Sequence, residues 1–199
     1  MKTENSGVKQ AAPDRKLFLV YSALFAALCS AGAFISIPLP FSPVPIVMQN
    51  FFAVLAGLVL GPIWGAASVA LFLLAGALGI PVFSGAAGGI AVFARPSGGF
   101  LVGYLPGAFI AGLIARSPKA AGARPGKKYF VPMLIAAAAG LLTVYIPGLI
   151  RLKSVLGGGW TAALAGGFFP FIPGDGIKAV LAAYCAPGLR RIVSRKLYE

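Results

Sequence analysis

Asp175 and Lys178 are the residues of this chain whose types and spacing are best suited to binding chemistry. Asp175 is the only acidic residue between Asp14 and Glu199, and it stands in the string FIPGDGIKAV, at the expected start of the last helix. Lys178 follows at i+3, on the same helical face. An aspartate at this position can cap the helix and still accept a hydrogen bond from a ligand N–H. Because an ionisable pair is costly in an apolar segment, the pair favours a ligand site over a purely local cap and ion pair.

Five other residues are candidates for ligand contacts. Arg95, in FARPSGGF, either meets a ligand carboxylate or only extends to the membrane interface. Gln49, in PIVMQNFF, either binds a ligand or pins two helices together, and its neighbour Asn50 is the less favoured candidate. Ser84 and Gly85 stand in PVFSGAAGG, a loop that could close over a ligand.

Several aromatic residues near the segment ends have two possible roles. They either form an interfacial belt, as aromatic side chains commonly do, or stack on a bound ligand. The candidates are Phe100, Tyr104, Trp160 and Phe171.

The composition excludes several kinds of chemistry. The chain has no His and only 4 Asp and Glu among 199 residues, so triad catalysis, His-ligated metals and paired-carboxylate catalysis are not expected. Between Gly122 and Lys128 the sequence lacks the spacing and the Ser/Thr of a nucleotide-binding P-loop. Cys29 and Cys185 both lie in apolar runs and are predicted to be small buried residues without a disulfide. No metal or cofactor is expected, and the energy for any active transport would come from another protein.

The elements that must position these residues are predicted to be membrane helices. Hydrophobic residues make up 59% of the chain and charged residues 11%, and the mean hydropathy is +0.91. A soluble domain of this size could not bury so much apolar surface, which makes the bilayer the expected solvent. The same hydropathy argues against nucleic-acid binding, despite a net charge of +13.

Glycine and proline divide the chain into six apolar segments. They cover residues 17–37, 46–60, 63–80, 98–115, 129–150 and about 174–187. The predicted fold is all-α and integral to the membrane. A single six-helix domain, 17–189, lies between a polar tail, 1–16, and a basic tail, 190–199. Segment 46–60 would span only about 22 Å, so its flanks must lengthen it.

The positive charges orient this bundle. Thirteen of the 17 Lys and Arg residues fall in the two tails and in the segment 116–128. The positive-inside rule therefore predicts cytoplasmic N and C termini and a multi-pass protein of the cell membrane, where the basic segments can meet anionic lipids. The other four cations are Arg95, Arg151, Lys153 and Lys178.

Three long Pro- and Gly-rich connectors then share the outer face. They are 38–45, 81–98 and 151–173, all expected to be irregular, and together they can form an outward-facing pocket or serve only as turns. On the first helix Ala23, Ala27 and Ala31 form a row of small residues at four-residue spacing, suited to close contact with another helix or a partner subunit.

Three strings resemble the BioY family, the biotin-specific S components of energy-coupling-factor (ECF) vitamin transporters. They are residues 35–49, 74–105 and 171–183, and they extend along most of the chain after residue 16. The resemblance implies six membrane helices in a prokaryotic membrane, with Asp175, Lys178 and Gln49 in the biotin site. It also implies that the alanine row meets a transmembrane T component, and that two ATPase subunits complete the complex.

Two other functions remain open from the residues alone. A stand-alone or proton-coupled small-molecule carrier would normally use several intramembrane acids, and only Asp175 is available. An integral-membrane enzyme, such as a lipid transferase, would need clustered Asp or His, usually with a metal. The prediction is therefore a binding subunit and not an enzyme.

Overall fold

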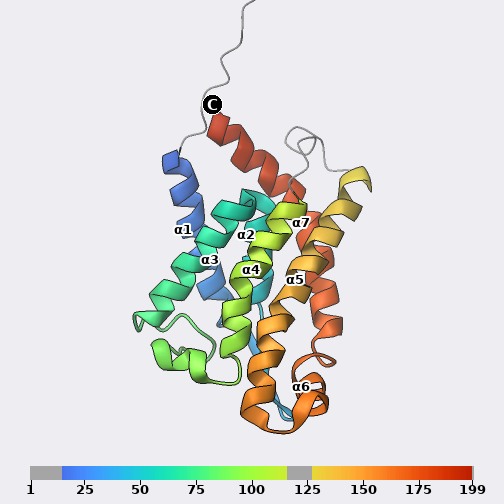
Figure 1. The fold of residues 1–199 in the computed structure, drawn as a ribbon. Coiled ribbons are helices and arrows are strands. Elements are labelled where there is room, and N and C mark those ends of the chain that lie inside the picture. Colours follow the sequence, from blue (N-terminus) through green and yellow to red (C-terminus); the bar gives the residue numbers. More distant parts are fainter. Residues whose placement is uncertain (1–14, 116–126, 199) are drawn as a thin grey trace, which may run out of the picture.

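The fold was analysed in a computed structural model that describes residues 15–115 and 127–198. The described residues form six helices of twelve or more residues, and Figure 1 shows that they alternate in direction along the chain. They are α1 (Arg15–Gly32), α2 (Gln49–Leu60), α3 (Pro62–Ala77), α4 (Gly98–Ile114), α5 (Lys127–Leu156) and α7 (Ile172–Tyr198). These correspond to the six predicted segments. The predicted polar tail up to residue 14 and most of the basic segment, 116–126, lie outside the described residues.

Helix α2 is the central element. It has 12 residues, and all but Asn50 and Phe52 are buried, because it contacts α1, α3, α4, α5 and α7. A helix that is apolar all round is stable only when neighbours surround it. At 1.5 Å per residue α2 is about 18 Å long, so its first turn begins well inside the bundle.

Glycines allow the helices around α2 to approach closely. A Cβ atom on Gly57 of α2 would overlap the carbonyl oxygen of Ala108 on α4. A Cβ on Gly65 of α3 would lie 2.5 Å from the Cα of Gly57. Small residues at such crossings bring the backbones into contact, which is the usual device for helix packing in membranes.

The connectors at one end of the bundle contain more regular structure than predicted. Strands β1 (Ser36–Leu39) and β2 (Ser42–Val47) form an antiparallel hairpin in place of the irregular connector 38–45. The connector 81–98 is largely irregular, as predicted, with a 3-10 helix η1 (Ile90–Ala94). Figure 1 places the hairpin, η1 and α6 at the end opposite to the C-terminus of α7.

The prediction of an irregular connector 151–173 was wrong. Helix α5 continues to Leu156, and α6 (Gly159–Gly167) follows at once. Gly157 and Gly159 adopt positive φ angles of 65° and 73°, which side-chain-bearing residues rarely adopt, and they separate α5 from α6. A turn at residues 168–171 then separates α6 from α7.

One further expectation needs correction at the surface of α7. The helix itself begins at Ile172, close to the predicted start, and continues into the basic tail as far as Tyr198. Cys29 is buried as predicted, but Cys185 is exposed, because it lies on an outward face of α7. Both cysteines are free.

Two of the described helices are long and apolar enough to cross a membrane by themselves. They are Arg15–Gly32 and Tyr129–Leu156, and three shorter apolar helices accompany them, namely α2, α3 and α4. Large hydrophobic side chains are exposed on the outside of the bundle, among them Leu74 and Ile146. An apolar exterior of this extent is typical of a lipid-facing surface.

Candidate functional site

A pocket opens between the hairpin, η1 and the helices α2, α4, α5 and α7. Nine of the eleven candidate residues line it, namely Gln49, Asn50, Ser84, Arg95, Phe100, Tyr104, Phe171, Asp175 and Lys178. Gly85 lines a neighbouring, more open pocket under the hairpin, of which Ser84 is also part. Segments that are far apart in the sequence therefore meet at one cavity.

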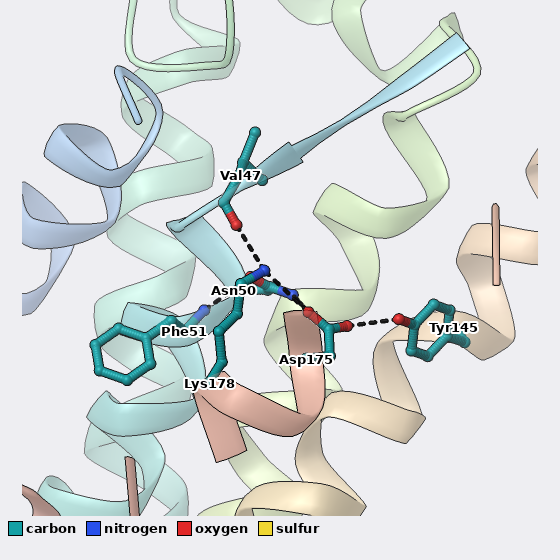
Figure 2. A network of polar contacts seen from close by, with 6 residues as sticks. All are labelled: Val47, Asn50, Phe51, Tyr145, Asp175 and Lys178. Carbon is teal, nitrogen blue, oxygen red and sulfur yellow. Dashed lines mark hydrogen bonds and ion pairs between the residues drawn. The ribbon is translucent and has the colours of Figure 1, made fainter. Parts of the chain in front are cut away.

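Asp175 is the centre of a buried polar network on the pocket wall (Figure 2). Only 8% of its surface is exposed. One carboxylate oxygen accepts hydrogen bonds from Asn50 Nδ2 at 3.0 Å and from Lys178 Nζ at 2.9 Å. The other accepts a hydrogen bond from the Tyr145 hydroxyl at 2.5 Å. The network thus joins α2, α5 and α7 around a single carboxylate.

Lys178 neutralises this carboxylate and has no donor left over. Its ammonium also donates to the Val47 carbonyl and to Asn50 Oδ1, both at 2.9 Å. An ammonium has three N–H groups, and all three are used. Lys178 is 5% exposed, and a buried charge is tolerable only when it is paired and hydrogen-bonded in this way. Its role is therefore to hold Asp175 and Asn50 in place.

The unused hydrogen-bonding capacity of the network defines what it can bind. A carboxylate offers about four acceptor positions, and three of those on Asp175 are occupied. The Asn50 amide has two N–H groups, of which one is bonded to Asp175. One acceptor position on Asp175 and one N–H of Asn50 thus remain in the network, which suits a ligand group that carries both an N–H and a carbonyl oxygen.

The local sequence explains how these side chains converge. The hairpin ends at Val47, and α2 begins two residues later, so Gln49 and Asn50 occupy the first turn of a buried helix. Helix α7 begins at Ile172, which leaves Asp175 inside the first turn: its backbone N–H donates to the Phe171 carbonyl at 2.8 Å. The prediction that Asp175 caps this helix was wrong, and its carboxylate points across to α2 and α5 instead.

The mouth of the pocket carries the second charged group. Arg95 is exposed and follows the last residue of η1. In the part of the chain that the structure describes, its guanidinium has no hydrogen-bond or ion-pair partner. Ser84 lies at the same mouth, and its hydroxyl is 2.9 Å from that of Ser36 on the hairpin. An anion that reaches the mouth would meet an unpaired cation.

Between the two polar ends the pocket wall is apolar and aromatic. Phe83, Phe100, Tyr104 and Phe171 are each buried to more than nine-tenths and line the cavity. Trp160, by contrast, lies outside this pocket: it is 50% exposed on α6, where Lys153 Nζ lies 4.5 Å from its ring centroid. Of the two roles left open for Trp160, its position favours the interfacial one.

Gln49 is fully buried, and its amide donates to the Val82 carbonyl at 3.3 Å. It therefore lines the pocket and ties α2 to the loop that contains Val82. Asn50, the less favoured neighbour, makes the contacts to the charged pair.

Tyr145 was missed by the sequence reasoning. A single tyrosine within an apolar span is a weak signal of a binding site. Its hydrogen-bond partner, Asp175, lies 30 residues away in the sequence, so no local pattern connects the two. Asn50 was undervalued for the same reason, since its partners Asp175 and Lys178 lie more than 120 residues away.

Comparisons with known proteins show which family and fold the chain resembles. A profile of the BioY family matches residues 3–195. The biotin transporter BioY of Rhizobium etli is 44% identical over 167 residues, which cover 83% of this chain and 88% of the relative. The biotin transporter BioY of Thermotoga maritima is 38% identical over 174 residues, which cover 87% of this chain and 96% of the relative. The crystal structure of the S-component for biotin from an ECF-type ABC transporter superposes with a TM-score of 0.81 at 31% identity, covering both chains in full.

Proposed function

Because the chain belongs to the BioY family, we propose that it works as the biotin-binding S component of an ECF-type vitamin transporter, with its ligand site at Asp175. Biotin transport is the function of the relatives, and the solved structure of similar fold is an S component for biotin. The observation that carries the site assignment is the buried Asp175–Lys178–Asn50–Tyr145 network on the pocket wall. The chain is thus a membrane protein of a transporter family and not itself an enzyme.

Biotin matches the two polar ends of the pocket. Its ureido group has N–H donors beside a carbonyl oxygen, which correspond to the remaining acceptor position of Asp175 and the remaining N–H of Asn50. Its bicyclic body would lie against the aromatic wall, and its carboxylate would reach Arg95 at the mouth. Gln49, Ser84, Gly85, Phe100 and Tyr104 complete the proposed site.

We propose that six helices of one domain, 17–189, cross the membrane, with both termini in the cytoplasm and the hairpin, η1 and α6 on the outer side. The alternating helix directions and the positive-inside rule support this orientation. In a Cys185→Ala background, a membrane-impermeant maleimide added to intact cells should label Ser154→Cys and not Ser194→Cys. The reverse pattern would invert the proposed topology.

Energy would come from partner proteins, a transmembrane T component and two ATPase subunits. No P-loop occurs in the sequence, and Asp175 is already bonded to Lys178, Asn50 and Tyr145, which leaves it poorly suited to carry protons. We propose no cofactor besides the transported biotin. The alternative of a stand-alone carrier predicts biotin uptake by cells that lack every ATPase partner.

The proposed function is tested by titrating the detergent-purified protein with biotin. Saturable binding is expected for the native chain. Asp175→Asn and Lys178→Met should each weaken it by at least about tenfold, because hydrogen bonds to charged groups contribute about 1.5–3 kcal/mol. Lys153→Met is the matched control, since it removes a cation that lies outside the pocket. Absence of binding by the native chain would refute the function, and unchanged binding by both site variants would refute the site.

A further inference from the structure

Arg151 of α5 contacts the backbone next to Arg95 without lining the pocket. Its guanidinium donates a hydrogen bond from Nη2 to the carbonyl oxygen of Ala94, the residue immediately before Arg95. Arg95 itself lies between η1 and α4, with extended backbone angles of φ −69° and ψ 165°. The direction of the Arg95 side chain therefore depends on where the end of η1 is held.

The stem of Arg151 also contacts the other side of this segment. A Cβ atom on Gly99, in the first turn of α4, would lie 2.5 Å from the Cβ of Arg151. The glycine thus lets α4 start directly against α5 at the level of Arg151. One side chain therefore contacts the chain just before Arg95 and again four residues after it.

Ion pairing does not explain why an arginine stands here. Asp175 is the only acidic residue among residues 15–115 and 127–198, and its described ion pair is with Lys178. The Arg151 Nε–H is buried and has no hydrogen-bond partner in the same part of the chain. A buried donor without a partner is unfavourable and calls for an explanation. The Ala94 carbonyl is the one polar partner that this guanidinium has in the described residues.

We propose that Arg151 is a positioning residue for recognition of the ligand carboxylate. It fixes the end of η1 so that the Arg95 guanidinium faces the mouth of the pocket, where the carboxylate of biotin arrives. This inference rests on the proposed function, and it adds that selectivity for an anionic tail depends on a residue that does not touch the ligand. The contribution of Arg151 then acts through Arg95 and not through the Asp175 network.

The test compares biotin with biotinamide, in which a neutral carboxamide replaces the carboxylate and the ureido head is unchanged. The native protein should bind biotin the more tightly of the two. Arg151→Met should lower the affinity for biotin by about tenfold, or 1.4 kcal/mol, and should leave the affinity for biotinamide within about twofold of native. Arg95→Met should remove the preference, and the double variant should be no weaker than Arg95→Met alone, because the two residues act as one unit. Arg151→Lys, which keeps a donor for the Ala94 carbonyl, should recover part of the preference.

Lys153→Met is the matched control, since it removes a positive charge from the same helix two residues away. It should leave both affinities unchanged, which separates positioning from the general electrostatic attraction of the outer end. Equal weakening of biotin and biotinamide by Arg151→Met would overturn the proposal in favour of a purely structural role. Native affinity in that variant, or equal affinity of the native protein for the two ligands, would also overturn it. Failure of the native protein to bind biotin at all would instead refute the proposed function.

Discussion

At the scale of single residues, the site combines one ion pair that the sequence predicted with a less favoured candidate, Asn50, and a residue that was missed, Tyr145. Asp175 and Lys178 are three residues apart on one helix, so their contact follows from helical geometry alone. Asn50 and Tyr145 reach the same carboxylate from α2 and α5. Their involvement depends on how three helices pack, which no local pattern in the sequence specifies.

Asn50 should matter more for binding than Gln49, although Gln49 was the stronger candidate from sequence. Asn50 bonds both charged groups, whereas the Gln49 amide donates to the neutral Val82 carbonyl. Asn50→Leu should therefore lower the affinity for biotin by about 10- to 100-fold, the equivalent of one or two hydrogen bonds to charged partners. Gln49→Leu should lower this affinity less. Isothermal titration of both variants measures the difference, and a larger loss for Gln49→Leu would contradict this account of the site.

At the scale of elements, the sequence predicted the long helices well and the connectors poorly. Apolar runs bounded by glycine and proline marked α1 to α5 and α7, since burial in the bundle or in lipid requires such runs. The hairpin of β1 and β2 was missed, because four prolines between residues 38 and 45 indicated a turn-rich loop. It is held in place by distant contacts, such as the hydrogen bond from the Ser42 hydroxyl to the Gly166 carbonyl of α6.

The packing of α2 against α4 gives a prediction about stability. Gly57→Ala places a methyl group against the Ala108 carbonyl, which neither backbone can avoid without moving. Overpacking of this kind costs about 1–3 kcal/mol, so the thermal unfolding midpoint in detergent should fall clearly. Gly188→Ala is the matched control, because a Cβ on this α7 glycine meets no atom within 4 Å. Equal unfolding midpoints for the two variants would show that the α2–α4 crossing can accommodate an added methyl group, contrary to the close contact in the structure.

At the scale of the whole molecule, one face of α1 is open to a partner. Ala23, Ala27 and Ala31 are all exposed, on the side of α1 away from the buried Phe25 and Cys29. The row of small side chains would allow a helix of the proposed T component to approach closely. The sequence predicted the spacing of this row, and the structure adds that no other part of the described chain covers it.

Replacing these three alanines together by leucine should separate assembly from ligand binding. Co-purification with the T component and the ATPase subunits should fall at least about tenfold, because three added side chains would hold the helices apart. Biotin affinity of the isolated protein should stay within about twofold, since the row is not part of the pocket. Ala165→Leu, at an exposed position on α6 at the other end of the molecule, is the control and should retain the complex. Intact assembly in the triple variant would place the partner elsewhere.

The hydrogen bonds made by Lys178 also affect the association and dissociation rates of the ligand. Since its three N–H groups are all bonded within the protein, and these bonds fix Asp175 and Asn50, we expect the network to keep its arrangement during capture. The association rate should then be set by diffusion through the mouth beside Arg95, and the residence time by the bonds at Asp175. Variants of the network should shorten the time that biotin stays bound and leave the rate of its arrival nearly native.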